Sequence, residues 1–311
     1  MLAAPNPAAA AIRIRGDGMR RLAAGFFALV VATSALIVLG ALVRAHEAGL
    51  ACPDWPLCFG EVIPEFDLKV AFEWSHRVAA GAISLVFAGL GVALFRNPDA
   101  RAAAGRLYLF AAALLVVQIL LGALTVWQLL AEWTVTSHLI TGNAFNACLL
   151  LLALRLREGR EAPVRPALPS AARIAVVASG VLLFAQLVLG GLVSSSYAGL
   201  ACPEWPTCNG GQWFPSWRGS VGLHLLHRMN GYLLGVVLVA TAVACRGVPR
   251  LAPWAWTAVV LGVVQLGVGI ANVLLALPVE VTGLHSALAA ALVLTLTGET
   301  REAVLARGED R

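Results

Sequence analysis

Four histidines lie inside long apolar stretches of the chain, where a polar side chain needs a partner or a function. They are His76, His138, His227 and His285, and each falls at a similar distance from the same end of its stretch. Imidazole is the commonest side-chain ligand of metals in proteins. A lone buried histidine more often forms a hydrogen bond between helices. Two pairs at matching positions favour metal ligation instead.

The number of ligands in each half of the chain indicates the kind of metal site. His76 and His138 lie in the first half, and His227 and His285 lie in the second. Two imidazoles on facing helices of a four-helix bundle can hold haem iron from both sides. Zinc is the weaker interpretation, because each half has only two histidines and the thiols lie elsewhere. We therefore predict two haem sites with these four histidines as axial iron ligands.

The two halves differ three residues before the first histidine of each pair. Glu73 precedes His76, whereas His224 precedes His227. Residues three apart share a helix face, so Glu73 and His224 should both lie beside a bound haem. A carboxyl group there can relay protons, which makes Glu73 a candidate catalytic residue and the first half the candidate reactive site. The alternative is that Glu73 only complements the positive end of its helix.

Two arginines directly follow the first histidine of each pair, at Arg77 and Arg228. Arginine binds carboxylates with two hydrogen bonds, so both residues are candidate partners for haem propionates. The alternative is that each aliphatic stem lies in the apolar layer while the guanidinium group reaches the membrane surface. The sequence leaves both interpretations open.

Four of the six cysteines form two C-x5-C motifs, and each motif encloses Pro-x-Trp-Pro. The motifs are Cys52/Cys58 and Cys202/Cys208, and both lie in polar loops. Two prolines stiffen each loop and hold the thiols close together, which favours one disulfide within each loop. Metal binding is the weaker alternative, because neither motif contains a histidine or a third cysteine. The other cysteines lie in apolar stretches and are expected to pack in the core: Cys148 and Cys245.

The composition indicates which elements must position these side chains. Hydrophobic residues make up 59% of the 311 residues, charged residues make up 13%, and the mean hydropathy is +0.82. This excludes a disordered chain, a coiled coil and a water-soluble enzyme. Several apolar stretches are long enough to cross a bilayer core of about 30 Å, so we predict an all-α integral membrane protein with eight transmembrane helices. They lie at 22–43, 71–95, 107–130, 135–154, 174–195, 221–245, 253–277 and 282–300.

An internal repeat divides the predicted helices into two sets of four. The segment GLACPDWPLC at 49–58 recurs as GLACPEWPTC at 199–208, which is an offset of 150 residues. Gln118-x3-Gly122 is likewise matched by Gln265-x3-Gly269. We therefore predict two tandem, pseudo-symmetric four-helix bundles in parallel topology. The predicted parts are a tail at 1–21, halves at 22–154 and 174–300, a linker at 155–173 and a second tail at 301–311.

The basic residues gather on one side of the predicted membrane. Of the 22 Lys and Arg residues, 17 lie in the tails and in the loops on the same side, and 5 lie on the other side. The positive-inside rule then places both termini in the cytoplasm and both cysteine loops on the outer face of the cell membrane. The outer compartment also favours disulfides. Because these loops account for the net charge of +5, we do not expect nucleic-acid binding.

Together these motifs resemble the haem A synthases of the bacterial CtaA type and their mitochondrial counterparts. The resemblance covers residues 25–300, and it depends on both cysteine motifs, on the Glu73-x2-His76 and His227-Arg228 pairs, and on the remaining two histidines. It implies oxidation of the C8 methyl group of haem O to the formyl group of haem A. The oxidation passes through the alcohol and the gem-diol, and haem A serves terminal oxidases.

The resemblance also implies different roles for the two halves. His76 and His138 would flank the substrate haem, and Glu73 would act in catalysis. His227 and His285 would bind a haem b cofactor. The expected partners are haem O, haem O synthase as its source, an electron donor that the sequence does not identify, and the lipid bilayer. The oligomeric state, including a homo-oligomer, is left open.

Two other functions fit part of this pattern. A dihaem b cytochrome that passes electrons from quinol to a partner at the outer face needs both histidine pairs, but it does not need Glu73. A transporter built from parallel repeats would use the histidines as substrate ligands. The shallow positions of the histidines and the absence of matched Gly or Pro breaks near the membrane centre count against a transporter.

Overall fold

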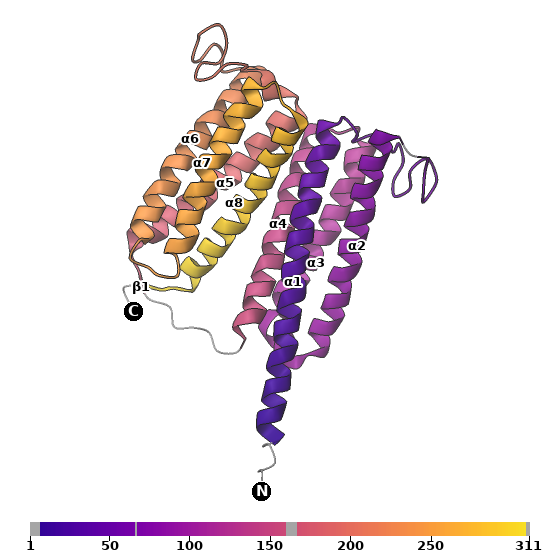
Figure 1. The fold of residues 1–311 in the computed structure, drawn as a ribbon, viewed down its shortest axis with the longest axis vertical. Helices are drawn as coiled ribbons and strands as arrows, with labels where there is room; N and C mark the ends of the chain where they lie inside the picture. The colour runs from indigo at the N-terminus through magenta and orange to yellow at the C-terminus, as the bar shows by residue number, and fades with distance from the viewer. Residues whose placement is uncertain (1–6, 66, 160–166, 309–311) are drawn as a thin grey trace.

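In the computed structural model, the described residues 7–65, 67–159 and 167–308 include eight helices that are long and apolar enough to cross a membrane (Figure 1). They are α1 (Pro7–Ala45), α2 (Leu68–Arg96), α3 (Pro98–Trp127), α4 (Glu132–Glu158), α5 (Ser170–Ser195), α6 (Gly219–Cys245), α7 (Ala252–Leu274) and α8 (Val279–Leu305). The smaller elements are η1 (Ala198–Leu200), β1 (Ala167–Leu168) and β2 (Arg307–Gly308). The predicted all-α membrane fold with eight transmembrane helices is confirmed.

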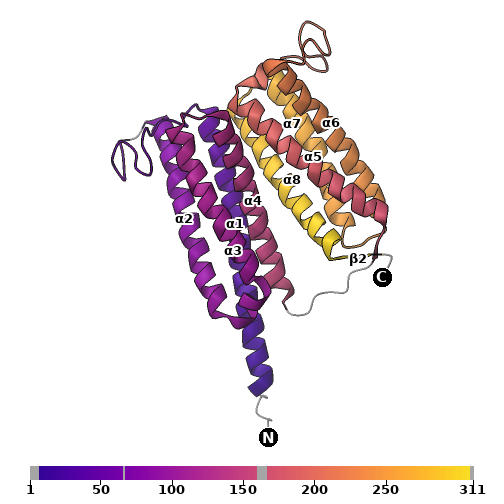
Figure 2. The same ribbon diagram turned by 180° about the vertical axis from the view of Figure 1, so that it is seen from behind.

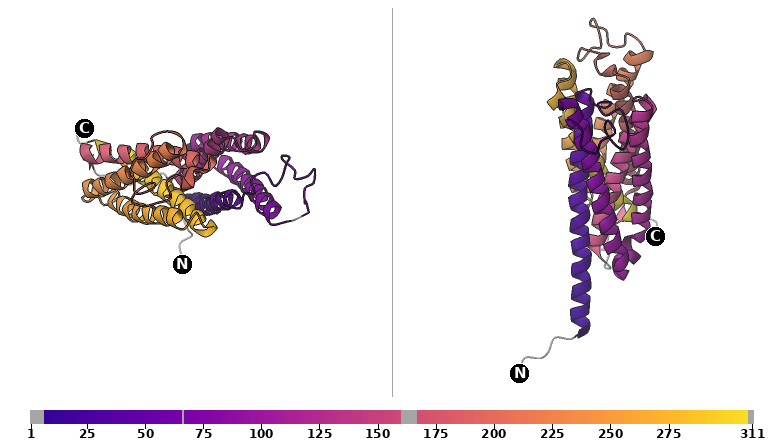
Figure 3. Two further views of the ribbon diagram at one scale, coloured as in Figure 1. Left: turned by 90° about the horizontal axis from the view of Figure 1, so that it is seen from above. Right: turned by 90° about the vertical axis from the view of Figure 1, so that its right-hand side faces the viewer.

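The helices form two bundles of four. α1–α4 pack around one core and α5–α8 around another, and in each bundle consecutive helices are in contact. The first core contains Phe26, Phe87 and Tyr108, with the rings of Phe87 and Tyr108 stacked at 4.6 Å. α1 and α4 face α5 and α8 across the boundary between the bundles (Figures 2 and 3). Every even-numbered helix, which carries a predicted ligand, therefore packs against the odd-numbered helix before it.

Several helices are longer than the apolar stretches that predicted them, because their ends are polar. α3 begins at Pro98, nine residues before the predicted stretch at 107–130. Asn97 Oδ1 accepts hydrogen bonds from two backbone N–H groups of the first turn, both at 3.1 Å, and caps the helix. Proline suits the first turn, where no backbone donor is needed. The predicted loop at 96–106 is therefore wrong, since most of it is helical.

The same effect changes the expected tails and linker. α1 begins at Pro7, so the described part of the predicted N-terminal tail is helical, which suits its alanine-rich sequence. α4 continues to Glu158 and α5 begins at Ser170, so the linker is shorter than predicted. α8 continues to Leu305, into the predicted C-terminal tail. The parts of these segments that lie outside the described residues are 1–6, 160–166 and 309–311.

The two cysteine loops lie at one end of the molecule, and both termini lie at the other (Figure 1). The turns at 128–131 and 275–278, which join α3 to α4 and α7 to α8, are four residues long, as the repeat predicts. They lie at the same end as the cysteine loops. The ends of the bundles therefore correspond to the two sides that the charge pattern distinguishes.

We expect the end that carries the termini to face the cytoplasm. Reporter fusions after Pro98, the first residue of α3, and after Gly247, in the turn between α6 and α7, should be active only as cytoplasmic reporters, because basic residues gather at that end. Fusions after Gly60 and Gly210, in the cysteine loops, should be active only as outer-face reporters. An outer-face signal from Pro98 or Gly247 would contradict the orientation. Ala162, a further fusion site in the linker, lies outside the described residues.

Candidate functional site

Each of the four histidines lies against a glycine of the preceding helix. In every case the ring atom Cε1 is 3.0–3.2 Å from the position that a Cβ atom would occupy on that glycine. The pairs are His76 with Gly40, His138 with Gly122, His227 with Gly190, and His285 with Gly269. Because protein interiors are closely packed, a larger residue at one of these glycines would displace the imidazole. These glycine contacts therefore fix where each ring lies.

The histidines occupy matching depths in the two bundles. His76 and His227 each follow the first residue of their helix by eight positions, and His138 and His285 each follow theirs by six. At about 1.5 Å of rise per residue, the two depths differ by about 3 Å. The structure therefore places one pair of predicted ligands at matching depths in each bundle.

The side chains of each pair fit haem iron. The Nδ1 atoms of all four rings are buried and have no hydrogen-bond partner among the described residues. The Nε2 atom of each ring is the nitrogen that remains for iron, and at His138 and His227 it faces a glutamine amide. Two imidazoles from two helices suit iron that is bound from both faces of a haem. Across the part of the chain that the structure describes, no three His, Cys, Asp or Glu side chains gather as a metal site, so neither pair has a third such ligand.

Both predicted disulfides are present in the loops that follow α1 and α5. The Cα atoms of Cys52 and Cys58 are 4.7 Å apart, those of Cys202 and Cys208 are 4.3 Å apart, and all four residues are buried. The remaining cysteines are free and buried in the helices, as predicted: Cys148 and Cys245.

One carboxylate organises the tip of each loop. Asp54 accepts a hydrogen bond from Gly60 N at 2.8 Å, and Glu204 accepts hydrogen bonds from Gly210 N at 2.9 Å and from Gly211 N at 3.0 Å. The hydrogen bonds from Gly60 and Gly211 are the largest causes that lower the pKa of the Asp54 and Glu204 carboxyls from their ordinary values. Hydrogen bonding to the charged form favours it, so both loops are organised around an ionised carboxylate.

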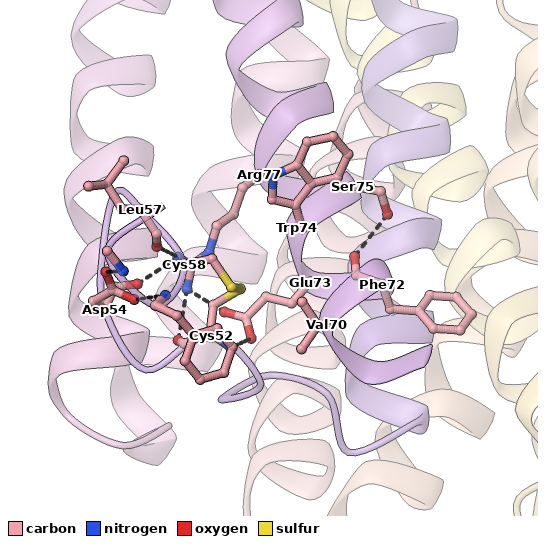
Figure 4. Close-up of a disulfide and its surroundings, with 12 residues drawn as sticks. Cys52, Asp54, Leu57, Cys58, Val70, Phe72, Glu73, Trp74, Ser75 and Arg77 are labelled. Carbon is pink, nitrogen blue, oxygen red and sulfur yellow. Dashed lines mark hydrogen bonds and ion pairs between the residues drawn. A yellow bond between two sulfur atoms is a disulfide. The ribbon is translucent and has the colours of Figure 1, made fainter. Parts of the chain in front are cut away.

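Glu73 ties the first loop to α2, as Figure 4 shows. The side chain is buried, its Oε2 accepts a hydrogen bond from Cys52 N at 2.8 Å, and its Oε1 forms an ion pair with Arg77. Arg77 also donates hydrogen bonds to the backbone oxygens of Asp54 and Leu57, both at 2.6 Å. The sequence predicted a position near the ligand His for Glu73, but it did not predict these loop contacts.

His224 takes the corresponding place in the second half. Its Nε2 accepts a hydrogen bond from Arg228 Nε at 3.2 Å, so its Nδ1 carries the proton and donates to the backbone oxygen of Ala198 at 3.0 Å. Arg228 also donates to Cys202 O at 2.6 Å and to Thr207 O at 3.1 Å. We call the pairs Glu73–Arg77 and His224–Arg228 the loop clamps. They hold the two loops from corresponding positions, but Glu73 accepts a hydrogen bond from Cys52 N, whereas His224 donates one to the backbone oxygen of Ala198.

The glycine contacts are the part of the site that the sequence did not predict. The repeated Gln118-x3-Gly122 and Gln265-x3-Gly269 segments were visible, but not what they touch. Gly40 and Gly190 share the repeat offset of 150 residues, which is the signal that could have identified them. Which histidine each glycine meets depends on how neighbouring helices pack, and sequence spacing does not supply that.

The fold and the site define a duplicated membrane protein in which each bundle holds a pair of half-buried histidines beneath a disulfide loop. Residues 23–297 match the COX15-CtaA family, described as cytochrome oxidase assembly protein, and the chain belongs to this family. It is 31% identical over 308 residues to a heme A synthase of Shewanella oneidensis, which covers 86% of this chain and 92% of the relative. A heme A synthase of Halalkalibacterium halodurans is 30% identical over 279 residues, with 87% and 93% covered. The resemblance to this family of membrane enzymes is confirmed.

Proposed function

We propose that this protein is a haem A synthase, an oxidoreductase that converts the C8 methyl group of haem O to the formyl group of haem A. A single difference within a duplicated site carries the proposal. Both halves share the histidine pair, the glycine contacts and the disulfide loop. The first loop clamp contains a carboxylate, Glu73, where the second contains His224. This asymmetry suits one haem that is chemically changed and one that is retained.

In this proposal the first pair binds the substrate. His76 and His138 hold the iron of haem O and orient the methyl group that is oxidised. Glu73 lies about one helical turn from His76 toward the outer end of α2. From there it carries protons between the reacting edge and the outer surface, because each two-electron oxidation on the way through the alcohol and the gem-diol releases protons.

The second pair holds a resident haem b, with His227 and His285 as its ligands. When bound, haem b supplies one-electron transfer between the first site and an electron-transfer partner. His224 and Arg228 position the loop above this site. Arg77 and Arg228 are our proposed partners for haem propionates, since each lies next to a ligand at the outer end of its helix.

We further propose that the protein works in the cell membrane with both termini in the cytoplasm. The substrate haem O comes from haem O synthase. Its oxidation needs an oxidant: with dioxygen, an electron donor reduces the second oxygen atom to water, and with water as the oxygen source, an electron acceptor takes the electrons. The chain does not identify this redox partner.

The test of the proposed function is the identity of the bound haems. The protein is purified from cells that make haem O, and its haems are extracted, separated and identified by mass. We expect haem b together with haem O, the alcohol and haem A, and we expect added haem O to be converted. A dihaem b cytochrome, which the shared geometry of the two pairs also fits, predicts haem b alone and no conversion. That result would overturn the proposal.

Gly269→Val should remove most of the haem b from the purified protein. A Cβ atom at Gly269 would lie 3.2 Å from His285 Cε1, so a branched side chain pushes the ring away from the iron. Gly267→Val, on the same helix, is the matched control, because a Cβ atom there meets nothing within 4 Å. The haem b content per protein is measured from the spectrum of the extracted haem. Equal loss in both variants would contradict the role of the glycine contact.

A further inference from the structure

A glutamine lies one helical turn before the glycine contact in three of the four cases. The residues at this position are Gln118 before Gly122, Gln186 before Gly190, Gln265 before Gly269, and Leu36 before Gly40. Leu36 is the counterpart of Gln186 at the repeat offset of 150 residues. The four histidines therefore share a glycine contact but differ in the polarity of the next turn.

In the first half this difference separates the two ligands. Gln118 Nε2 lies 3.3 Å from His138 Nε2, and its amide sits against Gly142, 2.9 Å from the position of a Cβ atom there. His76 faces no such amide, because the corresponding residue is Leu36. Among the described residues, His76 has no hydrogen bond from a side chain, whereas His138 has one at the ring nitrogen that usually binds iron.

In the second half the corresponding amides are held differently. Gln186 Nε2 lies 3.4 Å from His227 Nε2, but Asn230 Nδ2 donates a hydrogen bond to Gln186 Oε1 at 2.7 Å and fixes that amide. Gln265 turns away from the ring and donates to the backbone oxygen of His285 at 3.1 Å. Gln118 has no such restraint, because its Oε1 is buried without a partner among the described residues.

A neutral imidazole has one lone pair, so iron and an amide N–H compete for the same nitrogen. If His138 leaves the iron, Gln118 can donate to its free Nε2. If His76 leaves the iron, no described side chain donates to its ring, which lies beside the apolar side chain of Leu36 and near the backbone oxygen of that residue. The two ligands of the substrate are therefore not equivalent.

We propose that His138 is the ligand that leaves the substrate iron and opens a coordination position, while His76 stays bound. Gln118 is the positioning residue that receives the released ring. The inference rests on the proposed function, because it requires that the first histidine pair holds the substrate haem. It goes beyond that function, because it states which ligand is exchangeable and why.

Carbon monoxide titration tests the inference without measuring turnover. The full-length protein in detergent is loaded with haem O, reduced and titrated, and spectra with and without added haem O identify the first site. Gln118→Leu replaces the amide beside His138 with a leucine, the residue type that lies beside His76. The released His138 ring then has no hydrogen bond to gain, so His138 should stay bound to the iron more often. The affinity for carbon monoxide should fall about 5- to 10-fold, which corresponds to one lost hydrogen bond. Gln186→Leu is the matched control in the second half and should leave this affinity unchanged.

A second measurement uses the amount of haem O that the first site retains. His138→Ala should still bind haem O, with a high-spin spectrum that responds to carbon monoxide, whereas His76→Ala should lose haem O. Unchanged carbon monoxide affinity in Gln118→Leu would overturn the inference, and so would equal loss of haem O in both alanine variants. If the wild-type protein binds no haem O at all, the proposed function itself fails, which distinguishes the two results.

Discussion

Replacing His227 or His285 with alanine should remove haem b from the purified protein, whereas His76→Ala or His138→Ala should leave haem b in place and stop the formation of haem A. Each pair has no third His, Cys, Asp or Glu ligand among the described residues, so loss of one imidazole removes half of the iron's protein ligands. The two pairs lie in separate bundles, so a change in one should not disturb the other. The visible spectrum reports haem b, and extraction reports haem A.

A histidine outside the two pairs provides the control. His46 stacks on Phe72 at 4.1 Å near the outer end of α2, away from the glycine contacts. His46→Ala should keep both haem b and haem A. If all four ligand variants lose the same haem to the same extent, the assignment of different roles to the two halves is wrong.

The membrane fold could be predicted from the sequence because burial in lipid requires long apolar stretches. The same criterion misses the helix ends, which lie in the polar interface. Asn97 shows why. Its side chain caps α3, which begins nine residues before the apolar stretch. The start of this helix therefore depends on a local hydrogen bond rather than on hydropathy. The first turns of α1 and the last turns of α4 and α8 were missed because their residues are alanine-rich or polar rather than strongly apolar.

The sequence predicted those parts of the candidate site that depend on the spacing of residues along a single helix. The histidines stood out by residue type and depth, and the positions of Glu73 and His224 relative to them followed from helical spacing. The contact between Glu73 and Cys52 N spans 21 residues and arises because the loop folds back onto α2, which no local spacing indicates. The glycine contacts likewise join different helices, so only the packed bundle identifies them.

Exchanging the residues of the two loop clamps should distinguish a role of Glu73 in proton transfer from its role in holding the first loop. Glu73→His gives the first half the residue that the second half already has. His224 accepts a hydrogen bond from Arg228 and donates one to the backbone of the segment before its loop, so an imidazole at position 73 should accept from Arg77 and donate to the backbone of the first loop. We expect the disulfide and haem b to remain. Formation of haem A should fall about 100-fold or more, because an imidazole held as His224 is held has both ring nitrogens in hydrogen bonds and does not replace the carboxyl group as a proton carrier.

Glu73→Gln should also lose haem A and accumulate haem O or the alcohol, but it disturbs the clamp as well. The carboxylate uses one oxygen for Cys52 N and the other for Arg77, whereas an amide has only one acceptor oxygen. Glu73→Ala is less informative still, because it leaves the Arg77 charge without its partner, and breaking a buried ion pair in this way is strongly destabilising.

The reciprocal variant completes the comparison. His224→Glu places a carboxylate in the second clamp, where it can pair with Arg228 as Glu73 pairs with Arg77. Because the second site is not where haem O is oxidised, this variant should retain haem b and form haem A at the wild-type level. Haem extraction and chromatography after expression with a source of haem O measure both variants side by side. Wild-type haem A formation by Glu73→His would show that no carboxyl group is needed at position 73, which would contradict the proposed role of the carboxyl group as the proton carrier.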